Sequence, residues 1–224
     1  MKYDIIILCG GYGSRVKKYT NTRPKCLIEF NKKPFIYYQL KILKKLKINK
    51  IIISTYYKSN KIKKYLDGIK NDFEIKLIKE PSKLGTCGAI RYCLKYMKNN
   101  FFILYGDSYL NFNYKRLKRK KNLIKMAIYK NKNKFDKSNI IIKKKNLISY
   151  TKNNNFAEYI DYGISCVSKK VFKINSFLNI KDLSKFYEIV SSKNFIECFI
   201  VKKRFYEIGS YRGIKDFKNM ILKK

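Results

Sequence analysis

The segment IIILCGGYGSR, residues 5–15, decides the fold expected for this chain. Its apolar, β-branched beginning predicts a short buried strand that ends at Leu8. The strand runs into a turn that contains Gly10, Gly11 and Gly13. A strand that feeds a glycine-rich turn brings backbone N–H groups against a phosphate, so we expect Leu8 and these glycines to border a phosphate site.

Two cations follow this turn and suit the same ligand. Ser14 and Arg15 come next in the chain, and Lys25 lies ten residues further on. A guanidinium offers a planar fork to phosphate oxygens, and an ammonium offers a point charge. A tight turn with two solvated cations explains the local pattern equally well. Two other phosphate loops are excluded, because Val16 occupies the third glycine position of the dinucleotide fingerprint and no segment matches the P-loop.

Composition limits the class of protein. The chain has 224 residues, of which 46% are hydrophobic, which suits a single domain with a substantial core. No apolar run approaches the roughly 18 residues that span a bilayer, and the N-terminus does not resemble a signal peptide. The six cysteines form no C-x-x-C pair and there is no histidine, which predicts reduced thiols in a cytoplasmic protein and excludes catalysis by Ser-His-Asp or Cys-His groups.

The formal net charge of +38 is the main argument for a polyanion-binding protein. The excess is mostly lysine and is spread along the whole chain, which indicates a compositional bias rather than a footprint for one ligand. No nucleic-acid-binding motif is present. We therefore expect no specific nucleic-acid partner, only weak adsorption to polyanions.

Alternating strands and helices predict a parallel sheet in the first half of the chain. The second half predicts a hairpin, a helix capped by Asp182 and a last amphipathic helix. The predicted strands cover residues 5–8, 26–30, 50–54, 73–78, 100–105, 122–129, 140–142, 147–150 and 195–201, and the predicted helices begin near residues 34, 58, 89, 182 and 211.

Two further segments carry candidate ligand groups at strand ends. Glu80, Gly85 and Thr86 follow one predicted strand and open a helix, where glycines allow a ligand to approach the backbone. A helix start with small packing residues is the structural alternative. Gly106 and Asp107 follow another predicted strand, at the edge where parallel sheets bind ligands. An aspartate in an ordinary turn would give the same sequence pattern.

Taken in order, these motifs resemble the sugar-1-phosphate nucleotidyltransferases, also called NDP-sugar pyrophosphorylases. The matching patterns are G-G-x-G-[ST]-R with a Pro-Lys pair, E-x-x-x-L-G-T-x-G-A, Gly-Asp and a late Glu-x-Gly-Ser. The resemblance is strongest to short single-domain members that transfer guanylyl groups to heptose or mannose 1-phosphate. It implies a three-layer, Rossmann-like α/β fold (GT-A-like), with a mostly parallel mixed sheet flanked by helices. Residues 1–110 would form the nucleotide-binding half and 111–224 the sugar-phosphate-binding half, with no C-terminal β-helix.

The resemblance also implies roles for individual residues. Catalytic roles fall to Arg15, Lys25 and Asp107, and Mg²⁺ would be held by Asp107 and Glu207, where the family usually has a second aspartate. The implied nucleotide-binding residues are Leu8, Gly10, Gly11, Gly13, Ser14, Arg15, Lys25, Glu80, Gly85, Thr86, Gly106 and Asp107.

The acceptor half departs further from the family pattern. The implied sugar-phosphate-binding residues are Lys152, Glu158, Asp161 and Gly163, and surface salt bridges explain Glu158 and Asp161 equally well. Thr151 stands where many members have a glutamate that contacts the sugar. A nucleotide-binding protein that has lost turnover therefore stays open as an alternative.

The implied substrates are a nucleoside triphosphate and a sugar 1-phosphate. A carboxylate only accepts hydrogen bonds, so Glu80 suits the donors on the Watson–Crick edge of guanine and favours GTP over UTP, CTP and dTTP. The resemblance leaves the choice between a monomer and a homodimer open.

Overall fold

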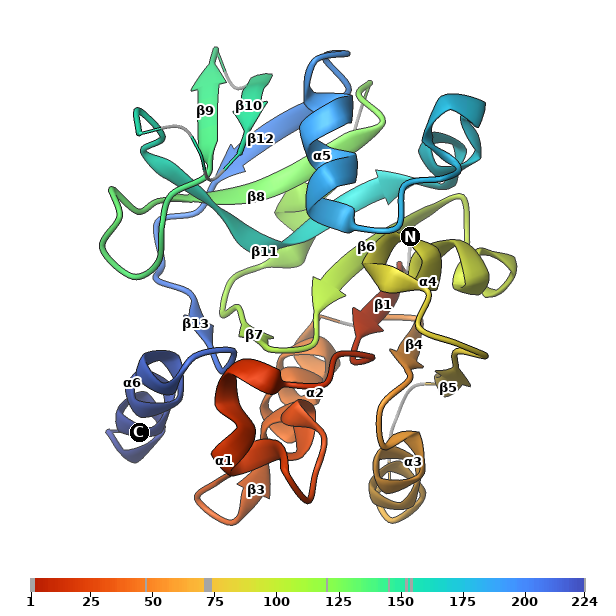
Figure 1. The fold of residues 1–224 in the computed structure, drawn as a ribbon, viewed down its shortest axis with the longest axis vertical. Helices are drawn as coiled ribbons and strands as arrows, with labels where there is room; N and C mark the ends of the chain where they lie inside the picture. The colour runs from red at the N-terminus through yellow and green to blue at the C-terminus, as the bar shows by residue number, and fades with distance from the viewer. Residues whose placement is uncertain are drawn as a thin grey trace.

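The computed structural model describes residues 3–46, 48–70, 74–119, 121–144, 146–151, 153 and 155–223. Within these ranges a nine-stranded sheet has the spatial order β5-β4-β1-β6-β11-β8-β12-β10-β9 (Figure 1). No helix in these ranges has both the length and the apolar character needed to cross a membrane. The sheet strands are β1 (Asp4–Leu8), β4 (Lys50–Thr55), β5 (Glu74–Lys79), β6 (Asn100–Tyr105), β8 (Ile124–Lys130), β9 (Ile140–Lys143), β10 (Asn146–Tyr150), β11 (Tyr159–Ser168) and β12 (Ile196–Ile200).

The first half of the chain forms the parallel part of the sheet, as predicted. Strands β5, β4, β1 and β6 are parallel neighbours. Strand β11 then runs antiparallel to both β6 and β8, and β12 pairs parallel with β8. The sheet is therefore mixed. The edge at which parallel sheets bind ligands, formed by the carboxyl ends of the strands, belongs here to the four parallel strands.

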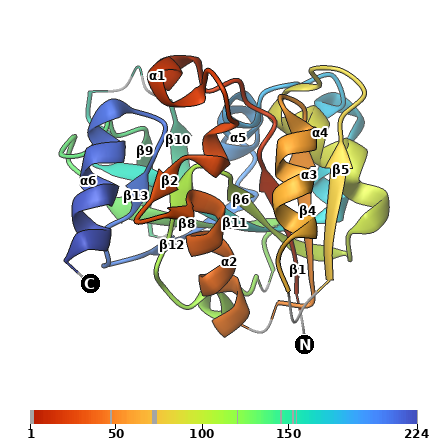
Figure 2. The same ribbon diagram turned by 90° about the horizontal axis from the view of Figure 1, so that it is seen from below.

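Helices cover both faces of the sheet, so the predicted three-layer α/β fold is confirmed. Ile5 and Ile7 of β1 pack into one core with α2 and α3, which lie across the near face of the sheet in Figure 2. Ile6 points to the opposite core, which contains α4 and α5. An apolar run that is buried on both faces is typical of a central parallel strand. The helices are α2 (Phe35–Lys45), α3 (Ser59–Asp67), α4 (Gly85–Cys93) and α5 (Leu183–Ser191).

The predicted hairpin of the second half is confirmed as β9 and β10. Strand β10 also pairs with β12, and Ile140 of β9 pairs with Tyr159 of β11. These pairings curl strands β8 to β12 back on themselves at one end of the molecule (Figure 1).

The strand predicted over residues 26–30 is wrong in its first part. Residues Lys25–Leu27 form a 3-10 turn, in which Leu27 N donates to Pro24 O at 2.9 Å and Ile28 N donates to Lys25 O at 3.0 Å. Only β2 (Glu29–Phe30) is extended, paired with β3 (Lys33–Pro34). The N–H groups of Leu27 and Ile28 find their acceptors within this turn, so this segment needs no neighbouring strand.

A third core joins the two ends of the chain. Phe217 of α6 (Tyr211–Leu222) packs its ring against Phe30 at 4.7 Å and against Phe35 at 5.0 Å between centroids. The ring of Tyr19 in α1 (Lys17–Thr20) lies 6.0 Å from the ring of Tyr211, measured between centroids. Next to this core β7 (Ser108–Tyr109) pairs with β13 (Tyr206–Glu207). These two-residue strands are too short to leave a periodic signal in the sequence, yet they bring Glu207 beside Asp107.

Candidate functional site

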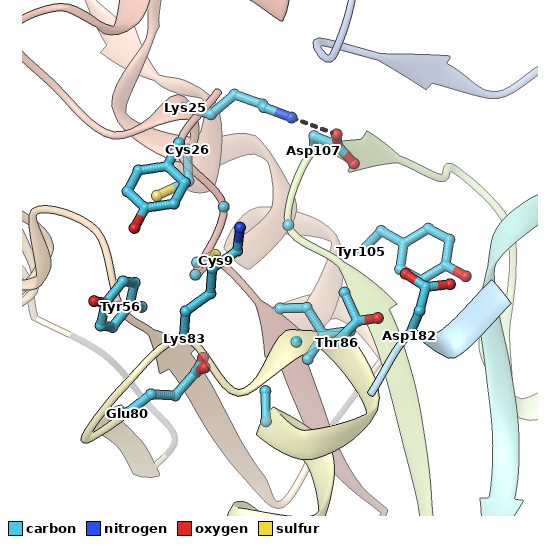
Figure 3. A pocket seen from close by; sticks show the side chains of 17 residues that line it. Cys9, Lys25, Cys26, Tyr56, Glu80, Lys83, Thr86, Tyr105, Asp107 and Asp182 are labelled. Atoms are coloured by element: carbon cyan, nitrogen blue, oxygen red, sulfur yellow. Dashed lines mark hydrogen bonds and ion pairs between the residues drawn. The ribbon is translucent and has the colours of Figure 1, made fainter. Parts of the chain in front are cut away.

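A cavity of about 450 Å³ opens at the carboxyl edge of the parallel strands (Figure 3). Its walls come from the segments that follow β1, β4, β5 and β6, together with the starts of α4 and α5. The lining residues are Leu8, Cys9, Gly10, Gly11, Tyr12, Lys25, Cys26, Tyr56, Glu80, Lys83, Gly85, Thr86, Ala89, Tyr105, Gly106, Asp107 and Asp182.

The glycine turn forms one wall of the cavity. A Cβ atom on Gly11 would meet no atom within 4 Å, whereas one on Gly10 would lie 2.8 Å from Glu80 Oε1. Gly13 has a φ of 71° and packs against Thr20, whose hydroxyl donates to Gly13 O at 3.1 Å. Gly13 therefore makes the turn, and the open space beside Gly11 admits a ligand close to the backbone.

Lys25 and Asp107 form the charged end of the cavity. Lys25 Nζ lies 2.8 Å from Asp107 Oδ2, and about a fifth to a quarter of each side chain is exposed. Lys25 reaches this position from the 3-10 turn, and Asp107 follows β6. Gly106 permits the turn after β6, because a Cβ there would collide with Leu8 O and lie 2.7 Å from Cys9 Sγ.

Arg15, Asp107 and Glu207 converge around Gly209. A Cβ atom built on Gly209 would lie 3.0 Å from Arg15 Nη2, from Asp107 Oδ2 and from Glu207 Oε2. No two of these three atoms are therefore more than about 6 Å apart, twice that distance. Ser14 and Arg15 belong to a short 3-10 turn, Ser14–Val16, outside the cavity wall. The sequence-predicted cation and both predicted metal ligands are thus brought together.

Glu207 is also tied to the first turn of α6. Its carboxylate accepts hydrogen bonds from the backbone N–H of Gly209 and from the hydroxyl of Ser210, and it lies over Gly213. Burial raises the pKa of Glu207, and the negative charge of Asp107 raises it further, while the hydrogen bonds and Arg15 oppose the rise. A bound cation near these two carboxylates, in addition to Arg15 and Lys25, would oppose the rise further.

Glu80 is buried on the opposite side of the cavity, with 5% of its surface exposed. Ser54 Oγ donates to Glu80 Oε1 at 2.9 Å. Burial raises the pKa of Glu80, and hydrogen bonds from Ser54 and from the backbone of Leu84 oppose that rise. Leu84 precedes α4, so Glu80 both stabilises the start of this helix and lines the cavity.

The motif at the start of α4 fastens the segment before α5. Gly85 has a φ of 76°, and a Cβ there would lie 2.6 Å from Lys181 O. Thr86 Oγ1 accepts from Leu183 N at 2.7 Å, and Arg91 Nη1 donates to Ile180 O at 2.7 Å. The structural interpretation of these small residues therefore holds for Gly85 and Thr86, although both also line the cavity.

The acceptor-half residues lie in different environments. Glu158 is half exposed and does not line the cavity. Its Oε2 lies 3.4 Å from Lys130 Nζ and its Oε1 lies 3.8 Å from Lys132 Nζ, so it forms ion pairs at the surface. Lys152 lies outside the described residues. Gly163, with a φ of 96°, allows β11 to approach Ser108, since a Cβ there would lie 2.7 Å from Ser108 Oγ.

Asp161 accepts hydrogen bonds from two tyrosines. Tyr105 OH and Tyr150 OH donate to Asp161 Oδ2 at 3.0 and 2.9 Å, and Gly163 N donates to Oδ1 at 2.8 Å. Burial raises the pKa of Asp161, and these hydrogen bonds oppose the rise. Tyr105 lines the cavity, so Asp161 orients a cavity side chain.

Several residues at the cavity were missed by sequence reasoning. Tyr56 and Tyr105 occupy ends of parallel strands, where a search of strand termini could have found them. Tyr12 and Lys83 occupy the variable positions of the two glycine motifs, which carry no sequence signal. Gln39 of α2 was missed as well, because the sequence of this helix indicates only an amphipathic packing face. Its Nε2 donates to Tyr105 O at 3.0 Å and to Ser108 O at 2.9 Å, and these hydrogen bonds fix the turn that contains Asp107.

Comparisons with known proteins identify relatives of this chain. A D-glycero-alpha-D-manno-heptose 1-phosphate guanylyltransferase of Campylobacter jejuni is 37% identical over 132 residues, which are 59% of this chain and 59% of that protein. A mannose-1-phosphate guanyltransferase of Kluyveromyces lactis is 31% identical over 121 residues, 50% of this chain and 32% of that protein. The match therefore spans less than two thirds of either relative.

Solved structures extend the similarity of fold to nearly the whole chain. The structure of HddC from Yersinia pseudotuberculosis has a TM-score of 0.81 at 23% identity and covers 98% of this chain and 99% of that one. The inositol-1-phosphate CTP transferase from T. maritima has a TM-score of 0.85 at 18% identity, with 99% and 96% covered. The family model for nucleotidyl transferases matches residues 4–147. This chain therefore belongs to the nucleotidyl transferase family.

Proposed function

We propose that the protein transfers a nucleotidyl group from a nucleoside triphosphate to a sugar 1-phosphate, yielding an NDP-sugar and pyrophosphate. The observation that carries this proposal is the single cavity that joins the open glycine turn, the Lys25–Asp107 pair and the buried Glu80. The similarity to heptose and mannose 1-phosphate guanylyltransferases favours guanylyl transfer to a heptose or mannose 1-phosphate. Such a product would serve the synthesis of cell-surface polysaccharides.

The nucleotide would lie along the cavity from Glu80 to Lys25. The carboxylate of Glu80 would accept from the donors on the Watson–Crick edge of guanine. Backbone N–H groups beside Gly11 would bind phosphate oxygens, and Lys25 and Arg15 would neutralise their charge. Gly85 and Thr86 would border the nucleoside, because both line the cavity.

The transfer itself needs positioning and charge neutralisation more than proton movement. An oxygen of the acceptor phosphate attacks the α-phosphorus and forms a new P–O bond. The bond between the α-phosphorus and the bridging oxygen breaks, and pyrophosphate leaves with the electron pair. Fixed positive charges at Lys25 and Arg15 stabilise the negative charge that accumulates on the leaving group.

The residues around Gly209 fit Mg²⁺. Mg²⁺ is usually bound through one or two carboxylates together with substrate phosphates, and Asp107 and Glu207 supply two hard oxygen donors. The described residues contain no group of three or more His, Cys, Asp or Glu side chains suited to a metal, so substrate oxygens and water would complete the coordination. When bound there, Mg²⁺ would neutralise phosphate charge.

The acceptor would enter from the side of residues 111–224, opposite the nucleotide-binding half, 1–110. We propose that Asp161 and Gly163 shape this side through Tyr105, and that Lys152 steers the acceptor phosphate. Glu158, in its surface ion pair, is a weaker candidate for contact with the sugar. The six buried free cysteines support a reducing compartment such as the cytoplasm, with the enzyme acting as a monomer or homodimer.

The test is pyrophosphate release measured across a panel of nucleoside triphosphates and sugar 1-phosphates. We expect the highest turnover with GTP and a heptose or mannose 1-phosphate, and a requirement for Mg²⁺. Asp107→Asn should lower turnover by at least about 10²-fold, because it removes charge at the reacting phosphates.

Lys25→Ala should lower turnover by a similar factor, and Lys121→Ala provides the matched control because Lys121 is an exposed lysine away from the cavity. Equal effects of both lysine substitutions would show that bulk charge matters and would refute the site. Nucleotide binding without turnover on any acceptor would favour the alternative of a binding protein.

A further inference from the structure

Three tyrosines and a lysine form a cluster at one rim of the cavity. The ring of Tyr12 lies 6.1 Å from that of Tyr56 at an interplanar angle of 86°, and 5.1 Å from that of Tyr57 at 55°. Lys83 Nζ lies 5.4 Å from the centre of the Tyr12 ring. Tyr12, Tyr56 and Lys83 all line the cavity, and Tyr12 is 45% exposed. Neighbouring rings therefore hold the Tyr12 ring while much of its surface faces solvent or a ligand.

This rim lies away from the Lys25–Asp107 pair. In Figure 3, Tyr56, Lys83 and Glu80 lie on one side, and the Lys25–Asp107 pair lies at another. Phosphates suit the charged end, so a base in the same cavity lies towards Glu80 and the aromatic rim. Every nucleobase has a flat face that stacks on an aromatic ring, whereas the two adjacent donors on the edge of guanine, N1–H and N2–H₂, suit the Glu80 carboxylate better than the edge of uracil or thymine.

Lys83 is a cation that points into the cavity and has no ion-pair partner among the described residues. The nearby carboxylate of Glu80 is buried and accepts a hydrogen bond from Ser54. The other cavity-lining lysine, Lys25, is paired with Asp107. The ammonium of Lys83 lies over the Tyr12 ring, a cation–π contact that keeps the charge at the rim. Its charge is thus available to a phosphate chain that leaves the base and crosses the cavity.

We propose that Tyr12 and Lys83 form a two-residue clamp on the nucleoside triphosphate, in which the Tyr12 ring stacks on the base and the Lys83 ammonium contacts the phosphates. This inference rests on the proposed function and adds two substrate-binding residues to it. Tyr12 and Lys83 come from two different loops, after β1 and after β5, so the nucleotide would bridge these loops. Stacking accounts for affinity towards any base, and Glu80 accounts for the choice of base.

The test separates base binding from phosphate binding by measuring the affinities of guanosine and GTP without an acceptor. Tyr12→Leu should lower both affinities by about tenfold, the size expected for loss of one stacked ring, and Tyr12→Phe should lower neither. Lys83→Gln should lower the affinity for GTP about tenfold and make it less dependent on salt, and it should leave guanosine binding unchanged. If the substrate panel selects another nucleotide, that nucleotide and its nucleoside replace GTP and guanosine.

Tyr92 and Lys95 provide the matched control pair. Lys95 Nζ lies 5.7 Å from the centre of the Tyr92 ring, both residues are exposed, and neither lines the cavity. Tyr92→Leu and Lys95→Gln should therefore leave nucleotide binding unchanged. Unchanged melting temperatures in all variants would show that binding rather than folding is affected.

The outcomes separate the clamp from the enzyme activity. If the wild-type protein turns over substrate and Tyr12→Leu and Lys83→Gln bind guanosine and GTP as the wild type does, the clamp is refuted and the proposed function stands. If no acceptor supports turnover but the two variants lose affinity in the predicted pattern, the clamp stands and the proposed transfer fails. If the wild-type protein binds no nucleotide, both are refuted.

Discussion

At the scale of single residues, Glu80 combines a packing role at the start of α4 with a place in the wall of the cavity. It is buried at the cavity wall, and Gly10 is small enough to leave room for its carboxylate. A buried carboxylate costs free energy unless its oxygens are satisfied, and the hydrogen bonds from Ser54 and from the backbone of Leu84 satisfy only part of that need. The donors of a guanine base would complete it.

This environment predicts a pH dependence of guanine binding. Burial raises the pKa of Glu80, so the group becomes protonated at a higher pH than an ordinary glutamate. The protonated form loses an acceptor, so guanosine affinity should fall as the pH is lowered from 7.5 towards 5. The fall should begin at a pH above the ordinary glutamate pKa of about 4.3.

Calorimetric titrations of guanosine at several pH values would measure this effect. Glu80→Gln should show weak, pH-independent binding, and Glu74→Gln, at an exposed glutamate, should behave as the wild type. A parallel pH profile in wild type and Glu80→Gln would mean that Glu80 does not read the base.

Gly11 provides a second prediction at this scale. A Cβ atom there meets nothing within 4 Å, so Gly11→Ala should change the free energy of unfolding by less than about 0.5 kcal/mol. The added methyl group occupies the space next to the backbone N–H groups, so GTP affinity should fall at least tenfold. Urea denaturation and calorimetry would measure the two quantities. Retained affinity would place the phosphates elsewhere in the cavity.

At the scale of elements, α4 and α5 are joined through the segment that precedes α5. The carbonyl of Lys181 lies against Gly85 and accepts from Cys87 N at 2.8 Å. Asp182 caps α5 by accepting from Ser184 N at 2.8 Å, as its sequence position predicts. The second glycine motif therefore stabilises the cavity wall through backbone contacts rather than only leaving space for a ligand.

Gly85→Ala should consequently destabilise the protein. The φ of 76° is unfavourable for alanine, and its Cβ would lie 2.6 Å from Lys181 O, so we expect a loss of about 2 kcal/mol or more in the free energy of unfolding. Gly68→Ala is the control, since a Cβ there makes only ordinary contacts at 3.6 Å and beyond. Urea denaturation compares the two variants. Equal stabilities would contradict the close approach of Lys181.

At the scale of the whole molecule, the dominant property is a net charge of +38, from 53 basic and 15 acidic residues. Like charges this numerous repel one another in the compact state, and salt screens that repulsion. The charge is spread over both halves of the chain rather than gathered at the cavity, where Lys25 is neutralised by Asp107.

The free energy of unfolding should therefore rise with salt. Between 20 mM and 500 mM NaCl we expect a gain of roughly 1 kcal/mol, the scale of a single close pair of unit charges in water. Urea is the suitable denaturant because it is uncharged, and KCl should act as NaCl does. A fall in stability with salt would show that attractive ion pairs outweigh the repulsion.

Binding to polyanions should follow the same bulk charge. Retention on heparin should be lost at moderate salt and should be the same for the wild type and Arg15→Ala, since one charge among 53 makes little difference. Tight, sequence-selective binding to a nucleic acid at physiological salt would revive the polyanion-binding alternative.

The sequence by itself determined the parallel half of the sheet, the glycine turn and the order of the motifs, because these depend on local patterns. A β-branched run followed by Gly10 and Gly11 specifies a buried strand and an open turn without help from distant residues. The cap at Asp182 and the β9–β10 hairpin are local in the same sense.

Only the tertiary structure decided which groups meet. Glu207 lies beside Asp107 and Arg15 because the two-residue strands β7 and β13 pair across nearly a hundred residues of chain, a contact with no periodic signature. Two other contacts also join residues that are far apart in the chain and have no periodic signature. Gln39 holds the turn that contains Asp107, and Gly85 lies against the carbonyl of Lys181. Tyr12 and Lys83 share a cavity rim because parallel strands place successive loops at one edge of the sheet, so proximity there follows from topology rather than from separation along the chain.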